Sequence, residues 1–556
     1  MPACSIAVIQ RRGVVALEFA GVGMGKVFDY VIVGAGSAGC VLAERLSRDP
    51  STHVAILEAG GDDRNLLVEA PLMMGQAITS KTLDWHYWTA PQGELNDRKL
   101  FWPRGKVLGG SSAINAMHYI RGADANYDEW RDDFGADGWG WQDVLPLFRE
   151  LEGRVGSPDD RHGYDGPLTV QDIDPLNPLT EAFFTACAAQ GVGRISDMNG
   201  ADQHGCSPYQ VTQRGTKRCS AAVAFLRPAM DRPNLSVIAK ALASRILMDG
   251  SRATGVEYRH KGQTWSVSAK REVILSGGAI NTPQLLQLSG IGDAGWLREA
   301  GVNPLIDLPG VGRNLQDHLD VLGQITTRSS TSLGISAATL PSWIVSLIKF
   351  ATGKPGLLSI NPVQGGAFFS SSFAEGLPDL QYAFIPAKVA PHGAKLPFGH
   401  GASLHVCHLY PKSRGELRIM SNDPSAHPHI DPKYLSDPQD LEVMIDGLQA
   451  ARNVLQHSAF DFDRKAEIWP DPSYRTRAQL ADDIKARAET LYHPVGTCSM
   501  GRGEMAVVDP TLKVYGTQSL RVADASVMPR LIGGNTNAPS MMIGARAAQI
   551  ILAEQD

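Results

Sequence analysis

Three glycines at the spacing G-x-G-x-x-G, followed by an acidic residue, form the most informative chemical motif of the chain. Gly34, Gly36 and Gly39 follow the short apolar run Tyr30–Val33, and Glu58 ends a second apolar run. Glycines at these positions allow a tight turn and let the backbone approach a pyrophosphate, which the N-terminus of the next helix would stabilise. A carboxylate at the position of Glu58 can accept both ribose hydroxyls and would repel a 2′-phosphate, which disfavours NADP. The motif therefore predicts a strand, glycine turn, helix and strand that bind an adenine dinucleotide.

A second glycine-rich stretch lies between Phe101 and Gly122. Two glycines and two serines, Gly109 to Ser112, precede a run with helical character. Such a turn places free backbone amides around a ligand that is rich in hydrogen-bond acceptors. A plain loop with a helix cap is the simpler alternative.

Length, charge and cysteine content restrict the class of protein. A chain of 556 residues exceeds what one hydrophobic core usually fills, so we expect two domains. A net charge of -6 and a pI of about 6.2 give no sign of nucleic-acid binding. The seven cysteines show no metal-ligand or redox C-x-x-C spacing, which is typical of a reducing cytoplasm. No apolar run is long enough to cross a bilayer.

The first residues precede the strand that should open the fold. Arg11 and Arg12 are followed by an apolar run that resembles a signal peptide until Glu18 interrupts it. We therefore favour a poorly ordered extension over residues 1–26, with Met24 as a candidate initiator, rather than a targeting signal.

Several motifs, taken together and in order, carry a resemblance to a known family. After the N-terminal fingerprint come residues 105–121, 278–292 and 310–318, and then the C-terminal pair 491–501 and 533–539. From Phe28 almost to its end, the chain resembles the glucose-methanol-choline family of FAD-dependent oxidoreductases. Within that family it is most similar to bacterial primary-alcohol dehydrogenases, with polyethylene-glycol, sorbose and choline dehydrogenases close behind.

The resemblance implies an α/β fold with a discontinuous cofactor domain. A Rossmann-like FAD-binding domain would comprise residues 27–150, 203–318 and 488–556. An α+β substrate domain, an antiparallel sheet with helices, would comprise residues 151–202 and 319–487. The strand-like alternation of residues 234–243 and 253–258 fits a sheet that covers the adenine.

The same resemblance assigns residues to the cofactor. Beside the glycine turn, the positions expected to contact FAD are Ser37, Ala38, Ala59, Arg104, Gly105, Leu108, Gly109, Ser112, Asn115, Ala116, Met117, His118, Ala243, Asp524, Ala525, Asn537 and Ala538. Some family members tether the flavin through a histidine just before the Arg-Gly-Lys run. Trp102 occupies the matching position here, so we expect non-covalent FAD.

Two residues near the C-terminus are the expected catalytic groups. An alcohol releases hydride from its carbon only as its hydroxyl proton leaves, so the reaction needs a base with a pKa near the working pH, and His493 is the candidate. The developing alkoxide needs a fixed hydrogen-bond donor, and a neutral amide such as Asn535 supplies one. Asn537 is the adjacent candidate and is assigned to the carbonyl edge of the flavin.

These assignments lead to one preferred function and two alternatives. The preferred reaction is oxidation of a primary alcohol to an aldehyde, with electrons passed to a quinone or another acceptor, because the chain has no second dinucleotide fingerprint. An oxidase of the same family would instead use O2, and a related lyase would leave the flavin unreduced. A serine hydrolase is disfavoured because no G-x-S-x-G elbow is present.

Two further features remained open from the sequence. Residues 340–350 have apolar side chains at helical spacing, followed by Lys349 and Lys354, which fits a core helix, an active-site lid, or a helix that faces a membrane or quinone. His405 and His408 are three residues apart, and we interpret them as structural rather than metal-binding because no third ligand follows.

Overall fold

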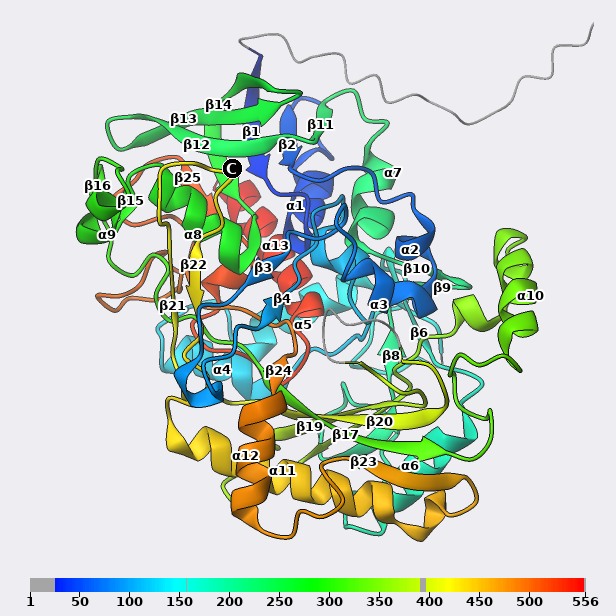
Figure 1. Cartoon of the computed structure of the whole chain (residues 1–556). Helices are drawn as coiled ribbons and strands as arrows, with labels where there is room; N and C mark the ends of the chain where they lie inside the picture. The colour runs from blue at the N-terminus through cyan, green and yellow to red at the C-terminus, as the bar shows by residue number, and fades with distance from the viewer. Residues whose placement is uncertain (1–25, 157, 391–396, 555–556) are drawn as a thin grey trace, which may run out of the picture.

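The computed structural model describes residues 26–156, 158–390 and 397–554. The predicted extension therefore lies outside the described residues, apart from Lys26. Two large sheets dominate the described chain, one near each end of the molecule in Figure 1, with the C-terminal helix α13 (Asn537–Ala553) between them.

The first sheet has a parallel core made from distant parts of the sequence. Its parallel strands run in the order β11, β2, β1, β14 and β25, with bounds Leu235–Ala239, Val54–Glu58, Val27–Val33, Gln263–Leu275 and Leu520–Val522. All residues of β2 and nearly all of β1 are buried, as expected for parallel strands covered on both faces. Strands β12 (Leu242–Asp249) and β13 (Arg252–His260) extend the sheet in antiparallel fashion.

Helices bring the ends of the chain together beneath this sheet. Helix α1 (Ser37–Leu46) begins at the glycine turn and packs along α13. Helix α8 (Gly278–Leu288) follows β14 in the same way that α1 follows β1. The carboxyl ends of parallel strands and the N-termini of the helices that follow them meet at one edge of a sheet. Two strand-to-helix turns and the C-terminal helix are thus brought together there.

The second sheet is antiparallel and has helices packed on it. Its order is β23, β17, β20, β19, β18 and β7, with bounds Arg464–Trp469, Leu319–Thr327, Gly401–His408, Leu380–Ile385, Gly365–Phe369 and Gly205–Pro208, and β24 (Glu489–Thr490) pairs with β17. Helix α11 (Pro438–Gln456) contacts β17 and β20 and packs against α12 (Arg477–Arg487), while α6 (Pro178–Ala188) contacts β18. The predicted fold class, α/β with a second antiparallel sheet, is confirmed.

Shorter elements fill the space between the sheets. The helical segments are α2 (Leu66–Glu69), α3 (Met74–Ala77), α4 (Asp124–Asp132), α5 (Trp141–Leu151), α7 (Arg227–Ala229), α9 (Ala294–Glu299) and α10 (Leu340–Ala351). Among the short strands, β3 (Tyr87–Trp88) pairs with β4 (Phe101–Trp102), and β21 (Glu416–Arg418) pairs with β22 (His429–Asp431). Strands β7 and β24 belong to the second sheet by pairing. The second sheet therefore includes two short segments, residues 205–208 and 489–490, that the sequence analysis assigns to the cofactor domain.

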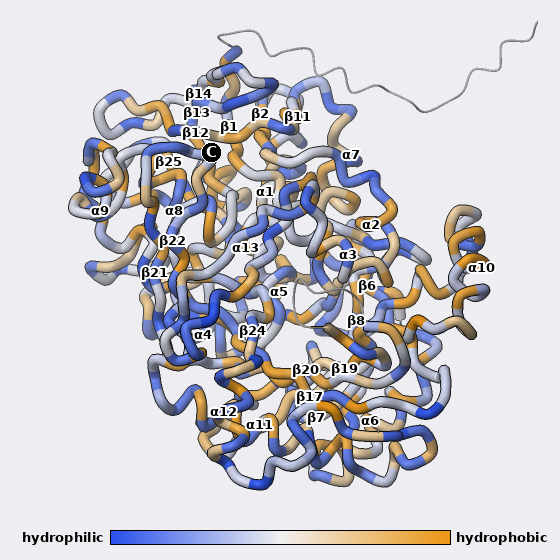
Figure 2. Tube along the Cα trace, viewed as in Figure 1, coloured by the Kyte–Doolittle hydropathy of each residue, from blue (hydrophilic) through white to orange (hydrophobic). Residues whose placement is uncertain are grey.

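Helix α10 projects from the body of the molecule. Figures 1 and 2 show it at one side, with apolar residues on the projecting segment. Ile344 is 59% exposed and Ile348 is 63% exposed, and Leu340, Val345 and Leu347 are exposed too. This exposure rules out the core-helix interpretation. No helix among the described residues is long and apolar enough to span a membrane.

Candidate active site

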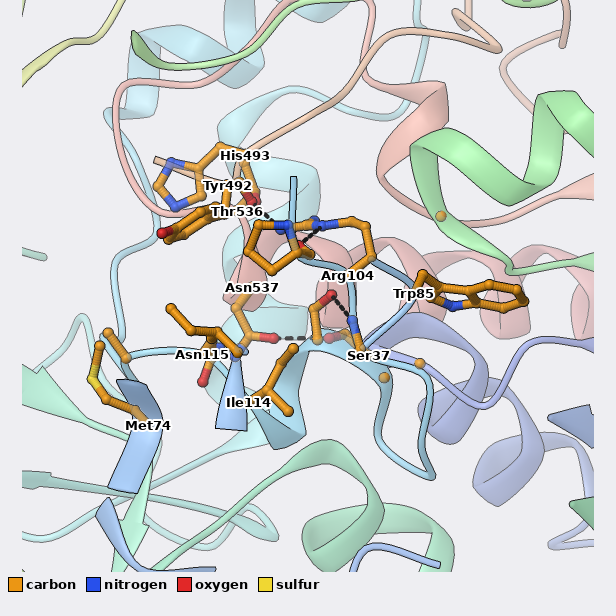
Figure 3. Close-up of a pocket in the computed structure, with 18 of the residues that line it drawn as sticks. Ser37, Met74, Trp85, Arg104, Ile114, Asn115, Tyr492, His493, Thr536 and Asn537 are labelled. Atoms are coloured by element: carbon orange, nitrogen blue, oxygen red, sulfur yellow. Dashed lines mark hydrogen bonds between the residues drawn. The ribbon is translucent and has the colours of Figure 1, made fainter. Parts of the chain in front are cut away.

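A cavity of about 440 Å³ brings together most of the residues predicted from the sequence. Figure 3 shows part of its lining, with side chains from the first turn, the second glycine-rich stretch and the C-terminal segments. The predicted residues that line it are Gly34, Gly36, Ser37, Ala38, Glu58, Ala59, Arg104, Gly105, Asn115, Ala116, Met117, His118, Ala243, His493, Asp524, Ala525, Asn535 and Asn537. The cavity therefore extends from the glycine turn to the two candidate catalytic side chains.

The two glycine-rich turns pack against each other without side chains between them. Gly110 has φ +54°, and a Cβ atom there would lie 2.7 Å from the Cα atom of Gly36. A Cβ atom at Gly39 would lie 1.9 Å from the carbonyl oxygen of Gly34. Gly36 is the N-cap residue of helix α1 and has no side chain to cap it, so the first amides of the helix remain available to a ligand. The two glycine turns and the N-terminus of α1 thus form a site with exposed backbone amides, which fits the pyrophosphate of an adenine dinucleotide.

Glu58 lies at the end of β2, as predicted, and also holds the turn together. Its carboxylate accepts hydrogen bonds from the amides of Ala35 (3.0 Å) and Gly60 (2.7 Å). Burial raises the pKa of Glu58 to about 7, although these amides oppose the shift. A carboxylate has about four lone-pair sites, so acceptor capacity remains for ribose hydroxyls.

Five predicted cofactor residues lie behind the cavity wall rather than on it: Gly39, Leu108, Gly109, Ser112 and Ala538. Ser112 is 2% exposed; its hydroxyl donates to the Gly109 carbonyl (2.6 Å) and accepts from the Ala221 amide (2.9 Å). Leu108 and Ala538 are part of the hydrophobic core. Their side chains support the turn and α13.

Asp524 connects the last strand of the first sheet to α8. Its carboxylate accepts hydrogen bonds from the amides of Ser526 (2.8 Å) and Gly278 (2.9 Å) and from the Thr282 hydroxyl (2.6 Å). The first of these bonds caps the short helical turn Ala525–Val527, as expected for an Asp after a strand. The other two fix the start of α8 against the cavity.

His493 and Asn535 come together although they lie on different segments. The Nδ2 atom of Asn535 is 3.2 Å from the Nε2 atom of His493. The Oδ1 atom of Asn535 accepts a hydrogen bond from the Nε2 atom of Gln381 at 3.3 Å. Because Gln381 can only donate through that nitrogen, this contact orients the Asn535 amide with its donor toward His493. A hydroxyl placed beside both groups could give its proton to the histidine and accept from the amide.

The electrostatic environment keeps the candidate base unprotonated. His493 is 8% exposed, and burial, followed by the nearby His318 and Arg104, lowers its pKa well below the usual value. Burial also lowers the pKa of the neighbouring His118 to about 3. For His493, this direction departs from the pKa near the working pH that the reaction favours, because the ring is buried and lies near the Arg104 guanidinium. The imidazole of His493 is therefore available as a proton acceptor.

Ser37 and Asn537 link the glycine turn to the C-terminal helix. The Ser37 hydroxyl donates to the Oδ1 atom of Asn537 at 2.8 Å, a bond drawn in Figure 3. The oxygen of this amide is thereby engaged, and its Nδ2 atom is left to donate. Arg104 donates to the Tyr492 carbonyl at 2.6 Å, next to His493. The predicted contacts of these residues with FAD remain predictions.

Gln381 is a site residue that the sequence reasoning missed. It lies on β19, where Gln381, Ala383 and Ile385 alternate with core residues and line the cavity. Period-two alternation could have identified this face, but nothing in the local sequence shows that it meets Asn535, which is 154 residues away.

His405 and His408 do not share a ligand site, whereas another group of side chains lies close enough together to hold an ion. His405 pairs with Asp320 (2.5 Å) and His408 lies 3.8 Å from Asp440, so the two histidines have different partners. Among the described residues, Asp159, His162 and Asp197 are close enough to share an ion. Both ring nitrogens of His162 contact carboxylates, and these raise its pKa to about 9 although burial opposes them.

The chain is similar to known proteins over nearly its whole length. The chain is 46% identical over 533 residues to an alcohol dehydrogenase [acceptor] of Pseudomonas putida, covering 95% of this chain and 96% of that protein. It is 41% identical to an oxygen-dependent choline dehydrogenase of Staphylococcus saprophyticus, covering 95% of each chain.

Solved structures and family models point to the same group. Pyridoxine 4-oxidase from Mesorbium loti is similar with a TM-score of 0.85 and 31% identity, over 94% of this chain and 98% of that one. A formate oxidase is similar with a TM-score of 0.88 and 26% identity, over 96% of this chain and 99% of that one. Two models described as GMC oxidoreductase match residues 28–320 and 411–544. The chain belongs to the GMC oxidoreductase family.

Proposed function

We propose that the protein oxidises a primary alcohol to an aldehyde and passes the electrons to a quinone or another acceptor that is not NAD. One observation carries the proposal: the imidazole Nε2 atom of His493 and the amide Nδ2 atom of Asn535 lie 3.2 Å apart in a cavity that is also lined by the dinucleotide turn. FAD is the cofactor, and the site formed by the two glycine turns has room for its pyrophosphate. The similarity to an acceptor-linked alcohol dehydrogenase supports the choice of reaction.

The residues of the site have separate roles in this reaction. When bound, FAD supplies the hydride acceptor. His493 takes the hydroxyl proton at Nε2, and Asn535 donates a hydrogen bond from Nδ2 to the oxygen as its charge develops. Gln381 holds the Asn535 amide in orientation through its 3.3 Å contact. Apolar residues, including Met74, Val363 and Ile385, line the same cavity and exclude water from the substrate.

The cofactor assignments follow from the same proposal. The residues of the two glycine turns, Glu58, Ala243, Asp524 and the start of α13 would hold FAD. Trp102 is 2% exposed and donates to Tyr434 (3.1 Å), so this position offers no nucleophile for a covalent link, and we propose that FAD is bound non-covalently. The domain that contains the first sheet would bind FAD, and the domain that contains the second sheet would bind the alcohol.

The decisive test is anaerobic mixing of the purified holoenzyme with a panel of alcohols. We expect primary alcohols to bleach the flavin absorbance, with the aldehyde formed in equal amount. A flavin that stays oxidised with every alcohol, aliphatic, aromatic, polyether, sugar or choline, would contradict the proposal and favour redox-neutral chemistry. Peroxide formation at the full rate of turnover in aerated buffer would identify an oxidase instead.

We also propose that α10 rests on a membrane surface, where a lipid-soluble acceptor could reach the site. Trp343 of α10 lines the cavity, while Ile344 and Ile348 are exposed. Lys349 and Lys354 are exposed beside them and suit an anionic lipid surface. The helix therefore combines an apolar face, basic residues and a position at the cavity.

Removal of the apolar face of α10 should detach the protein from lipid. We expect the holoenzyme to co-sediment with phosphatidylglycerol vesicles, and expect Ile344→Asp with Ile348→Asp to weaken binding by about tenfold or more, because each buried Ile side chain contributes about 1.5 to 3 kcal/mol. The matched control is Phe462→Asp, an exposed apolar residue outside α10. Equal sedimentation of the α10 variant and the control would refute the membrane contact.

A further inference from the structure

The segment Asp317 to His318 contacts the candidate base twice, although neither residue lines the cavity. It belongs to the motif 310–318, for which the sequence suggested no chemical role. Asp317 accepts a hydrogen bond from the backbone amide of His493 at 2.7 Å. The Nδ1 atom of His318 lies 2.8 Å from the Nδ1 atom of His493.

The carboxylate of Asp317 is itself held in place. It accepts hydrogen bonds from the hydroxyls of Tyr434 and Thr490 in addition to the His493 amide. Thr490 lies on β24, three residues before His493, and its hydroxyl also accepts from the Tyr492 amide at 2.8 Å. The backbone that carries the base is thus fixed to the start of β17.

The protons on the imidazole rings of His318 and His493 can be assigned by starting from the Leu409 carbonyl, which contacts His318. The Nε2 atom of His318 lies 2.9 Å from the carbonyl oxygen of Leu409, which can only accept, so this nitrogen carries a proton. His318 is fully buried, and burial lowers its pKa to about 3, so the ring is neutral. A neutral ring protonated at Nε2 has a lone pair at Nδ1.

The hydrogen bond between the two rings then has only one possible donor, which is His493. Because His318 accepts at Nδ1, the proton between the rings belongs to Nδ1 of His493. The lone pair of His493 must therefore be at Nε2, which is the nitrogen next to Asn535. The opposite tautomer would place two lone pairs 2.8 Å apart at the inner contact and no base in the cavity.

We infer that His318 is a positioning residue that selects the tautomer of His493 with its basic Nε2 atom in the cavity. This inference rests on the proposed role of His493 as the base. The hydrogen-bonded chain ends at the Leu409 carbonyl, which cannot take up a proton. A proton that His493 takes up could therefore pass as far as His318 along this chain of contacts but not beyond it.

Two substitutions at His318 separate hydrogen bonding from packing. His318→Asn places an amide oxygen near the former Nδ1 atom and can still accept from His493. His318→Leu fills a similar volume and cannot accept. We expect the rate of anaerobic flavin reduction at saturating alcohol to fall by less than about tenfold in His318→Asn and by about a hundredfold or more in His318→Leu, because the wrong tautomer removes the base. Flavin absorbance and melting temperature serve as controls for folding, and the KM for the alcohol should change little.

A measurement that does not depend on turnover tests the tautomer itself. Histidine labelled with 15N gives a distinct proton correlation pattern for each tautomer, and the signals of His493 are those lost in His493→Ala. We expect the Nδ1-protonated form in the wild type and in His318→Asn, and a mixture or the Nε2-protonated form in His318→Leu. An Nε2-protonated His493 in the wild type, or equal reduction rates in the Leu and Asn variants, would overturn the inference. Failure of every alcohol to reduce the flavin would refute the proposed function but would leave the tautomer result intact.

Discussion

Replacement of His493 by alanine is expected to leave FAD bound and to lower turnover by about two to four orders of magnitude. The side chain belongs to neither of the two glycine-rich turns that would hold FAD, so its removal should not disturb cofactor binding. The loss arises because the neighbouring Asn535 can donate a hydrogen bond but has no basic nitrogen that could take the hydroxyl proton in place of His493. Stopped-flow reduction of the flavin under anaerobic conditions measures this step directly.

The pH dependence of the same experiment distinguishes a base from a structural histidine. The pKa of His493 is lowered, so the imidazole stays unprotonated, and therefore competent, well below pH 6.5. The wild-type reduction rate should then stay level from pH 8 down to about pH 6. In His493→Ala the residual rate should rise with pH as hydroxide replaces the base. His204→Ala, which removes an exposed histidine, is the matched control and should behave like the wild type. Full activity of His493→Ala at neutral pH would refute the assignment.

The cofactor half of the fold could be predicted because its signals are local. Tyr30 to Val33 and the glycines at 34, 36 and 39 are adjacent in sequence, and the strand, turn and helix form where the pattern places them. The strand that ends at Glu58 was equally clear, since burial on both faces requires a continuous apolar run. Family resemblance then supplied the order in which distant motifs return to the same sheet.

The positions of individual side chains in the site were less predictable. Ser112 and Leu108 belong to a motif that the resemblance assigns to the cofactor, yet their side chains are buried in the protein interior. In a turn, some residues face the ligand and others face the core, and the sequence does not show which residues do which. Gln381 and His318 were missed for another reason. Each acts on a partner more than 150 residues away, and such contacts depend on how distant segments of the chain pair and pack in three dimensions.

Helix α10 illustrates the limit of amphipathic patterns. The spacing of its apolar residues predicted the helix, and the structure has it at residues 340–351. The pattern could not say whether the apolar face meets a core or solvent, since both give the same periodicity. Only the tertiary structure shows that Ser346 and Phe350 are buried while Ile344 and Ile348 are exposed.

Asn535→Ala is expected to slow flavin reduction on the order of a hundredfold, by analogy with the loss of one oxyanion donor. Unlike the loss of the base, this change should be similar at every pH, because an amide does not titrate. Replacement of Asn535 by histidine should restore part of the rate, since a ring N–H can donate from a comparable position. The measurement is the same anaerobic reduction, together with the Kd of the alcohol, which should change less than the rate because the alkoxide charge develops only in the transition state.

Substitutions at Asn537 and Gln381 serve as controls, because they distinguish loss of the Asn535 hydrogen bond from a general disturbance of the site. Asn537→Ala removes an amide whose oxygen accepts a hydrogen bond from Ser37, at the start of α1, and should affect FAD affinity more than the reduction rate. Gln381→Leu leaves Asn535 in place but frees its amide to rotate, so it should produce a loss smaller than that of Asn535→Ala and no further loss when the two are combined. A negligible effect of Asn535→Ala with a large effect of Asn537→Ala would transfer the donor role to Asn537. The amide that stabilises the alkoxide would then be the one that begins α13, and the helix N-terminus would supply the remaining donors.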